Sequence, residues 1–346
     1  MAFNKGPALN ALIGGIIMAI ASSLHLLVRG KITGISGSFF KSIHCEEVYY
    51  NLSFLLGMIL ISAIYKSIFP SYSSIFFETS SSYLSDLSFL GFCISGFLVG
   101  YGTKLANGCT SGHGVCGLPR LSKRSIVAVI TFCICGILFA TFRYYVPFLV
   151  TDFLTEYIPV FDSAIITWIS FIACIGGIAV IIVPLITKKK WSDLRDYIIA
   201  LIIGMLFGYG LLQSGMVERH TVINFLTISK HWDYTLVIVL ASAVGVNLIT
   251  FYLILKYKSK PIYGTYSLPT KTKVDGKLLL GSAVFGIGWG MGGICPGPAV
   301  IASYVYLPYT AGFLGMMALG QYCAMWSEGF IDKHVGGNTG FALFKD

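Results

Sequence analysis

The residues best suited to chemistry lie in a polar stretch over 100–117, which reads GYGTKLANGCTSGHGVCG. It holds two cysteines, a histidine and several hydroxyl and amide side chains in an otherwise apolar chain. A second stretch begins at 286 and reads GIGWGMGGICPGPAVI. Its residues Gly286, Gly288 and Cys295 match Gly100, Gly102 and Cys109 of the first stretch with the same separation along the chain. We call this separation, from Gly100 to Gly286, the repeat offset. We therefore expect two glycine-rich helices, each ending in a cysteine and a turn, whose ends face each other across a substrate path.

The residues after each cysteine could start a helix. Thr110 and Ser111 are good N-cap residues, and Pro296 or Pro298 suits the first helical turn. A helix N-terminus directed at the middle of a membrane offers free N–H groups and partial positive charge, which suit an anion. The two turns therefore favour a path for an anion.

Two facing thiols narrow the kind of anion. A thiol is a weak donor with a soft, polarizable sulfur, so Cys109 and Cys295 suit a sulfur-bearing solute better than chloride or a sugar. Cys116 is a second lining candidate, and His113 either donates a hydrogen bond to the solute or caps the turn. The expected path residues are Cys109, Cys295, Cys116, His113, Thr110, Ser111, Gly108, Asn107, Pro296 and Gly297.

Other interpretations of these residues stay open. A cysteine among glycines can be no more than a small packing residue. Cys109, His113 and Cys116 also have the spacing CxxxHxxC, but structural zinc needs four ligands and no fourth is spaced nearby, so we expect neither a metal nor another cofactor. The P-loop, HExxH and GxSxG motifs are absent from the sequence, which favours a protein that is not an enzyme.

The composition is that of a polytopic membrane protein. Hydrophobic residues make up 55% of the chain and charged residues 11%, against about a quarter charged in soluble domains. The mean hydropathy is +0.79. The net charge of +9 is not accompanied by a basic patch with interleaved aromatics, so nucleic acid is not an expected partner. We expect the apolar run at 8–28 to remain as a span rather than to be removed as a signal peptide.

Apolar runs of spanning length predict nine membrane helices. We expect four further short or re-entrant elements at 32–44, 110–119, 218–229 and 296–306. With nine spans, nineteen of the 24 Lys and Arg residues fall on one side, so the N-terminus is expected outside and the C-terminus in the cytoplasm or an organelle matrix. The lysine-rich loop at 256–277 is expected to be a solvated linker on the inner side. The predicted spans are 8–28, 48–68, 88–106, 123–142, 162–187, 195–213, 234–256, 276–293 and 308–326.

The nine predicted spans divide into four, a single linking span and four. The single span makes the second group of four enter the membrane from the opposite face, which inverts it relative to the first, as in many transporters. The expected fold is therefore all-α and built from two inverted repeats. The repeats are predicted at 1–145 and 193–330, with a one-span linker at 146–192 and a tail at 331–346.

The two motifs resemble those of the YeeE/YedE family of sulfur-compound permeases. The two signature regions of that family look like the segments NGCTSGHGVCGLPRLSKRS and FGIGWGMGGICPGP of this chain, and its first-span motif looks like GKITGISG. The resemblance covers 8–142 and 195–326. It implies an hourglass-like protein of inverted repeats, with nine spans and four shorter helices. It also implies a narrow centre where thiosulfate passes between cysteine thiols, here Cys109 and Cys295. Some members have a further cysteine in the opening span, where this chain has only Ser22 and Ser23 as small polar residues.

The sequence thus predicts a permease for thiosulfate or a related small sulfur oxyanion. Two alternatives remain: a transporter-derived accessory subunit of a larger membrane complex, and a membrane thiol oxidoreductase. The expected partners are the lipid bilayer, the anion and, on the inner side, a sulfur-carrier protein or a larger assembly. A bacterial cytoplasmic membrane and a mitochondrial inner membrane are both compatible with the sequence.

Overall fold

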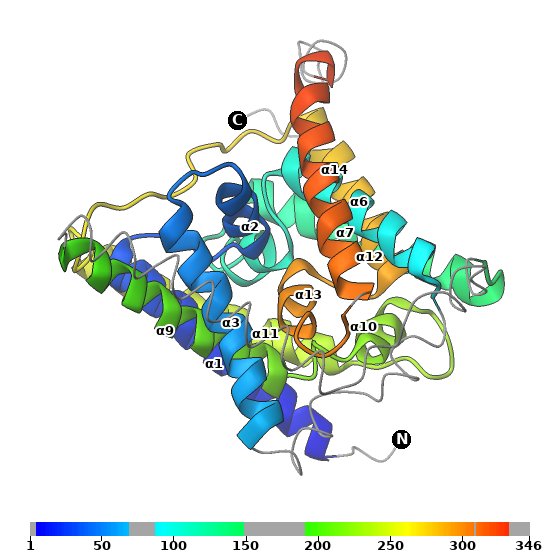
Figure 1. Ribbon diagram of the computed structural model, residues 1–346, viewed down its shortest axis with the longest axis horizontal. Helices are drawn as coiled ribbons and strands as arrows, with labels where there is room; N and C mark the ends of the chain where they lie inside the picture. The colour runs from blue at the N-terminus through cyan, green and yellow to red at the C-terminus, as the bar shows by residue number, and fades with distance from the viewer. Residues whose placement is uncertain (1–4, 69–86, 149–190, 308, 332–346) are drawn as a thin grey trace.

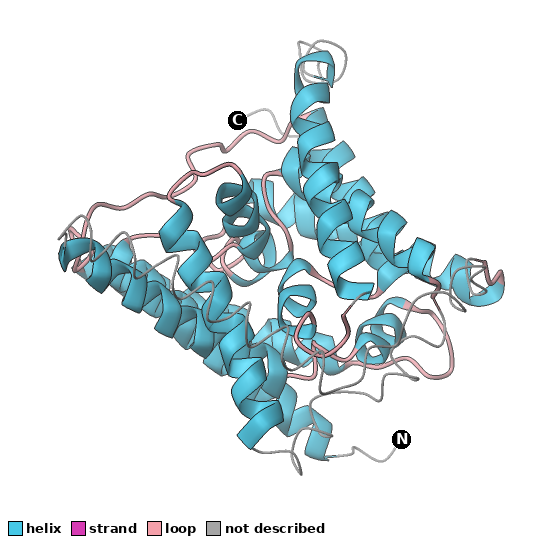
Figure 2. Ribbon diagram, in the orientation of Figure 1, coloured by secondary structure: helices cyan, strands magenta, loops and turns pink. Residues whose placement is uncertain are grey.

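The chain folds as an assembly of long helices with short helices between them. The computed structural model describes residues 5–68, 87–148, 191–307 and 309–331. No strand occurs in these ranges apart from one isolated bridge between Lys31 and Ser267 (Figure 2). The long helices are α1 (Lys5–Arg29), α3 (Val48–Ile68), α6 (Phe89–Ala106), α7 (Lys123–Tyr145), α9 (Trp191–Gln213), α11 (Thr235–Tyr257), α12 (Gly276–Gly292) and α14 (Tyr309–Ile331).

The long helices form two groups, each with members from both ends of the chain. In one group α3 packs on α9, α9 on α1, and α1 on α11. In the other, α14 packs on α6, α6 on α12, and α12 on α7. Figure 1 shows the first group running diagonally at the lower left and the second at the upper right. Within the described residues, every close pairing of long helices joins one from 5–145 to one from 191–331.

Four short helices lie between these groups, one in each predicted short element. They are α2 (Ile35–Ile43), the π-helix η1 (Thr110–Val115), α10 (Arg219–Leu226) and α13 (Pro296–Ala302). Polar side chains on the long helices bind main-chain carbonyl groups of η1 and α13. Asn247 Nδ2 donates to Val115 O at 2.9 Å, and Ser62 Oγ donates to Ile301 O at 3.1 Å. The two acceptor residues are separated by the repeat offset. Corresponding carbonyls of η1 and α13 are thus tied to α11 and α3.

Glycine sets the contact between α6 and α12. A Cβ at Gly102 would overlap the backbone of Phe285 and Gly281, and one at Gly288 would lie 2.9 Å from Val99 N and 3.1 Å from Ser95 O. Ser95 and Val99 precede Gly281 and Phe285 by the repeat offset. Close backbone approach through small residues is the usual way membrane helices pack, and here both helices use it at matching positions.

The protein is an integral multi-pass membrane protein. Seven helices in the described part of the chain are long and apolar enough to span a bilayer. Helix α14 occupies the last of the nine predicted positions and has 23 residues, but it is not among those seven. The predicted span at 162–187 and all but the first residue of the predicted tail lie outside the described residues.

Candidate substrate path

The two cysteine motifs form turns at the ends of α6 and α12. We call residues 107–110 the Cys109 turn and residues 293–296 the Cys295 turn. Each long helix ends in a left-handed residue, Asn107 with φ 59° and Gly293 with φ 64°, which is a conformation that glycine and asparagine tolerate. Each cysteine then precedes a short helix, and Pro296 is the first residue of α13, as the sequence predicts.

The predicted capping by Thr110 or Ser111 is wrong. Helix η1 begins at Thr110, and the residue at its N-cap is Cys109, whose side chain makes no capping hydrogen bond. The two hydroxyl groups are used across the turns instead. Ser111 Oγ lies 3.1 Å from Cys109 Sγ and accepts a hydrogen bond from Ile35 N at 3.3 Å. Both side chains therefore connect the turn to its neighbours rather than start the helix.

The two turns are in contact. Thr110 Oγ1 donates to Cys295 Sγ at 3.5 Å across 185 residues of sequence. Cys109 and Cys295 are each 1% exposed. Cys116 is fully buried, and its thiol donates to Thr33 O at 3.4 Å, so it contacts the loop after α1. Pro296 and Gly297 are buried in α13.

The last carbonyls of the two glycine-rich helices are both held by side chains. His113 Nε2 donates to Ala106 O at 3.2 Å, so the neutral imidazole accepts from Ser125 Oγ at Nδ1, 3.1 Å away. Arg219 Nε donates to Gly292 O at 2.7 Å, and Gly292 matches Ala106 at the repeat offset. His113 thus caps the turn, one of its two predicted roles.

Arg219 is a functional candidate that sequence reasoning missed. The side chain is only 1% exposed, and its guanidinium lies 5.3 Å from the centre of the Phe92 ring. An arginine is rarely buried so completely. The sequence carries no signal for this, because the contact depends on α10 folding back onto the end of α12.

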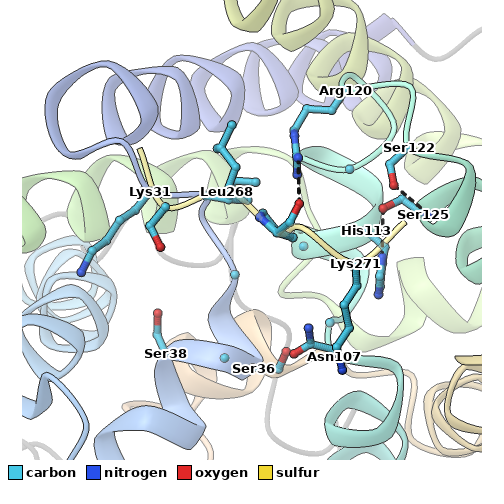
Figure 3. A pocket seen from close by; sticks show the side chains of 18 of the residues that line it. Lys31, Ser36, Ser38, Asn107, His113, Arg120, Ser122, Ser125, Leu268 and Lys271 are labelled. Carbon is cyan, nitrogen blue, oxygen red and sulfur yellow. Dashed lines mark hydrogen bonds between the residues drawn. The ribbon is translucent and has the colours of Figure 1, made fainter. Parts of the chain in front are cut away.

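A large basic cavity opens beside the Cys109 turn. Its volume is about 1540 Å³, and Asn107, Gly108, Gly112 and His113 contribute to its wall. Figure 3 shows Lys271 extending toward Asn107 and Ser36 inside it. Its charged lining comprises two glutamates, Glu46 and Glu47, and nine cations: Arg29, Lys31, Lys41, Lys104, Arg120, Lys123, Arg124, Lys271 and Lys273.

The cavity keeps an excess of positive charge after its ion pairs are formed. Partial burial raises the pKa of Glu47, but the hydrogen bond from Lys31 and the charges of Lys31, Lys41 and Arg29 outweigh burial and hold that pKa below its ordinary value. Glu47 therefore stays ionised and pairs with Lys31 at 2.6 Å. In the described part of the chain, several lining cations make no ion pair, namely Lys41, Lys104, Arg120, Lys271 and Lys273.

The connecting segment 258–275 is largely exposed, as expected of a solvated linker, and it also forms part of this wall. Backbone N–H groups of Ile262 and Tyr263 donate to Leu27 O and Val28 O at 2.9 and 2.8 Å. Farther along, Arg120 Nη2 donates to Pro269 O at 3.4 Å (Figure 3), and Arg124 Nη1 donates to Lys273 O at 2.6 Å. These bonds use main-chain atoms, so side-chain composition did not reveal them.

The cavity ends at the Cys109 turn and does not include any of the three buried cysteine sulfurs. Cys109, Cys116 and Cys295 are not among its lining residues, whereas their neighbours Asn107, Gly108 and His113 are. His25 lines the cavity too, and its ring nitrogens are satisfied by Thr33 Oγ1 at 2.9 Å and Tyr50 OH at 2.7 Å. The described arrangement is thus a basic vestibule that ends at the Cys109 turn, and Thr110 connects this turn to the Cys295 turn.

Comparison with known proteins identifies the class. A family model described as a family of unknown function, DUF6691, matches residues 195–323. A protein of Xylella fastidiosa strain Temecula1 named "Probable transporter" is 38% identical over 132 residues, which are 38% of this chain and 88% of the relative. This chain belongs to that family of probable transporters. A second protein of that strain, with the same printed name, is 34% identical over 131 residues, 38% of this chain and 91% of the relative.

The transporter is thus more than twice as long as these relatives. A matching protein from strain 9a5c has the same proportions, with 38% identity over 126 residues that form 36% of this chain and 86% of the relative. The names describe transport and specify no substrate. They agree with a multi-pass membrane protein that takes a small molecule across the bilayer.

Proposed function

We propose that this protein is a permease for thiosulfate or a related small sulfur-containing anion, which passes between the thiols of Cys109 and Cys295. The observation that carries the proposal is the basic vestibule that ends at the Cys109 turn, in contact with the Cys295 turn through Thr110. A cleft lined by one sign of charge raises the local concentration of the opposite ion. The charge selects an anion, and the paired soft sulfurs favour one that itself carries sulfur.

We further propose that the two parts of the chain are inverted repeats. The matching pairs Gly102 and Gly288, Val115 and Ile301, and Ala106 and Gly292 support this, since the members of each pair are separated by the repeat offset and make equivalent contacts. In such repeats the site lies near the bilayer midplane where the halves meet. By the positive-inside rule the basic vestibule faces the cytoplasm or matrix.

Passage requires the buried turns to separate. Cys109 and Cys295 are each 1% exposed, so an anion reaches them only when the Thr110 hydroxyl leaves the Cys295 sulfur and the turns move apart. The short helices η1 and α13 follow directly on the turns, so small shifts of these helices open the path. The concentration gradient and consumption of the anion inside then drive net uptake.

The direct test is uptake of ³⁵S-labelled thiosulfate into proteoliposomes containing the purified full-length chain. We expect saturable uptake that unlabelled thiosulfate competes for better than sulfate does, because sulfate has no terminal sulfur for the thiols. Empty liposomes give the background. Uptake no greater than this background, in liposomes shown to contain folded protein, would contradict the proposal.

The vestibule charge gives a separate prediction. Lys271→Glu reverses a charge inside the cavity, and we expect thiosulfate flux at low ionic strength to fall about three- to tenfold because anion attraction weakens. Lys260→Glu is the matched control, since Lys260 is an exposed residue of the same segment that does not line the cavity. In about 1 M salt, where the Debye length is about 3 Å, the two variants should transport alike. Equal flux at low salt would argue against the vestibule as an entry or exit route.

A further inference from the structure

Trp289 of α12 has a buried polar group that the fold does not satisfy. The side chain is 3% exposed, and its indole N–H has no hydrogen-bond partner among the described residues. The indole is close to the Cys295 sulfur without being aligned for a hydrogen bond to it. Buried indole N–H groups normally find a partner, so an unsatisfied one in a native structure requires an explanation.

The ring is fixed in this orientation by its neighbours. It stacks on Phe285 with an interplanar angle of 3°, and Phe132 meets it edge-on at 80° with ring centres 5.9 Å apart. Phe225 lies 6.4 Å away on a third element, α10. Because three aromatic rings surround the indole, it does not turn to find another acceptor. The N–H is therefore held toward the Cys295 turn.

Glycines flank Trp289 on both sides in α12. Gly288 and Gly290 contact the backbones of α6 and α7, where a Cβ would lie against Val99 N in one case and would overlap Gly136 O in the other. Trp289 therefore brings a large side chain and a fixed donor into the closely packed segment that leads to Cys295. An unsatisfied donor costs stability, so its presence beside the proposed path points to an acceptor that arrives from outside the protein.

The donors near Cys295 share one chemistry. Thr110 provides an O–H, Cys295 an S–H, and Trp289 an N–H that can only donate. Thr110 is half-buried, so one member of this set is partly reachable from solvent. Neutral donors that converge in a dehydrated site can bind the oxygen of an oxyanion. Because these donors carry no fixed positive charge, they do not hold the anion too tightly for transport.

We propose that the Trp289 indole N–H binds the transported anion, donating a hydrogen bond to an oxygen of thiosulfate or a related sulfur oxyanion while its sulfur contacts Cys295. This inference rests on the proposed function and adds the residue that distinguishes an oxyanion from a purely soft sulfur ligand. Trp289 thus contributes selectivity at the narrowest part of the path, where the cations of the vestibule do not reach.

The test uses Trp289→Phe, which keeps an aromatic ring and removes the N–H. In proteoliposomes we expect the KM for labelled thiosulfate to rise about tenfold, as for loss of one hydrogen bond to an anion. Trp232→Phe is the matched control, since the Trp232 N–H already donates to Phe225 O at 3.0 Å in an exposed position. Its KM should equal that of the wild type.

Thermal unfolding in detergent separates binding from a structural role. Removing an unsatisfied buried donor should leave the melting midpoint of Trp289→Phe equal to or above that of the wild type. A lower midpoint with an unchanged KM would show that the indole serves packing and would overturn the inference. Wild-type uptake with the same KM in Trp289→Phe would also overturn it while leaving the proposed function intact, whereas no uptake by the wild type would overturn both.

Discussion

Replacing Cys295 by alanine is expected to abolish thiosulfate uptake, with a loss of about a hundredfold or more in transport rate at low substrate. The Cys295 thiol is buried where the two turns meet, with Thr110 on one side and Trp289 on another. Removing its sulfur takes away the soft contact that offsets the loss of water around the anion. The same loss is expected for Cys109→Ala, and uptake into proteoliposomes measures both.

The controls for this result come from the other cysteines and from serine. Cys323→Ala changes a half-buried thiol on α14 and should transport as the wild type does. Cys295→Ser retains a donor but loses the polarizable sulfur, so we expect it to transport sulfite relatively better than thiosulfate. Full thiosulfate uptake by both Cys109→Ala and Cys295→Ala, at normal protein abundance, would remove the thiols from the mechanism.

The largest effect on stability is expected for Gly102→Ala. A methyl group there would overlap backbone atoms of Phe285 and Gly281, which cannot move aside as a flexible side chain would. We expect a cost of about 3 kcal/mol or more, at the upper end of overpacking effects, because α6 and α12 must separate along their contact. Lower yield and a reduced melting midpoint in detergent would report it.

Gly245→Ala provides the comparison. Gly245 lies in α11, and a Cβ there would meet nothing within 4 Å. Alanine at such a helix position should be neutral or stabilise the protein by about 0.5–1 kcal/mol, because it reduces the backbone entropy lost on folding. If Gly102→Ala and Gly245→Ala unfolded at the same temperature, the close approach of α6 and α12 would not hold the fold together.

Much of the helical framework follows from hydropathy and glycine spacing. The eight long helices start and end within a few residues of eight predicted spans, because a stretch that must cross lipid satisfies its backbone within itself. The short elements were also predictable, since Gly30 and Asn107 interrupt apolar runs with residues that tolerate positive φ. The offset between the two cysteine motifs led directly to the expectation that the turns adjoin.

The details of the site depend on contacts that a linear pattern does not encode. Thr110 reaches across to Cys295 rather than capping its own helix, which follows from the position of α13 and not from the residue types near 110. Arg219 was missed for the same reason, since it holds the end of a helix distant in sequence. The anchoring of the segment 258–275 was not predictable, because its bonds come from main-chain groups that every sequence has.

The interleaving of the long helices has a consequence for biogenesis. Among the residues that the structure describes, the faces of α6 and α1 that carry the closest contacts are covered by helices from 191–331. When the ribosome has released residues 5–145 into the bilayer, those glycine-lined surfaces still border lipid or the insertion machinery. The nascent protein therefore completes its structure late, after α14 has been translated, and truncation anywhere before that helix should yield a species that quality-control proteases remove.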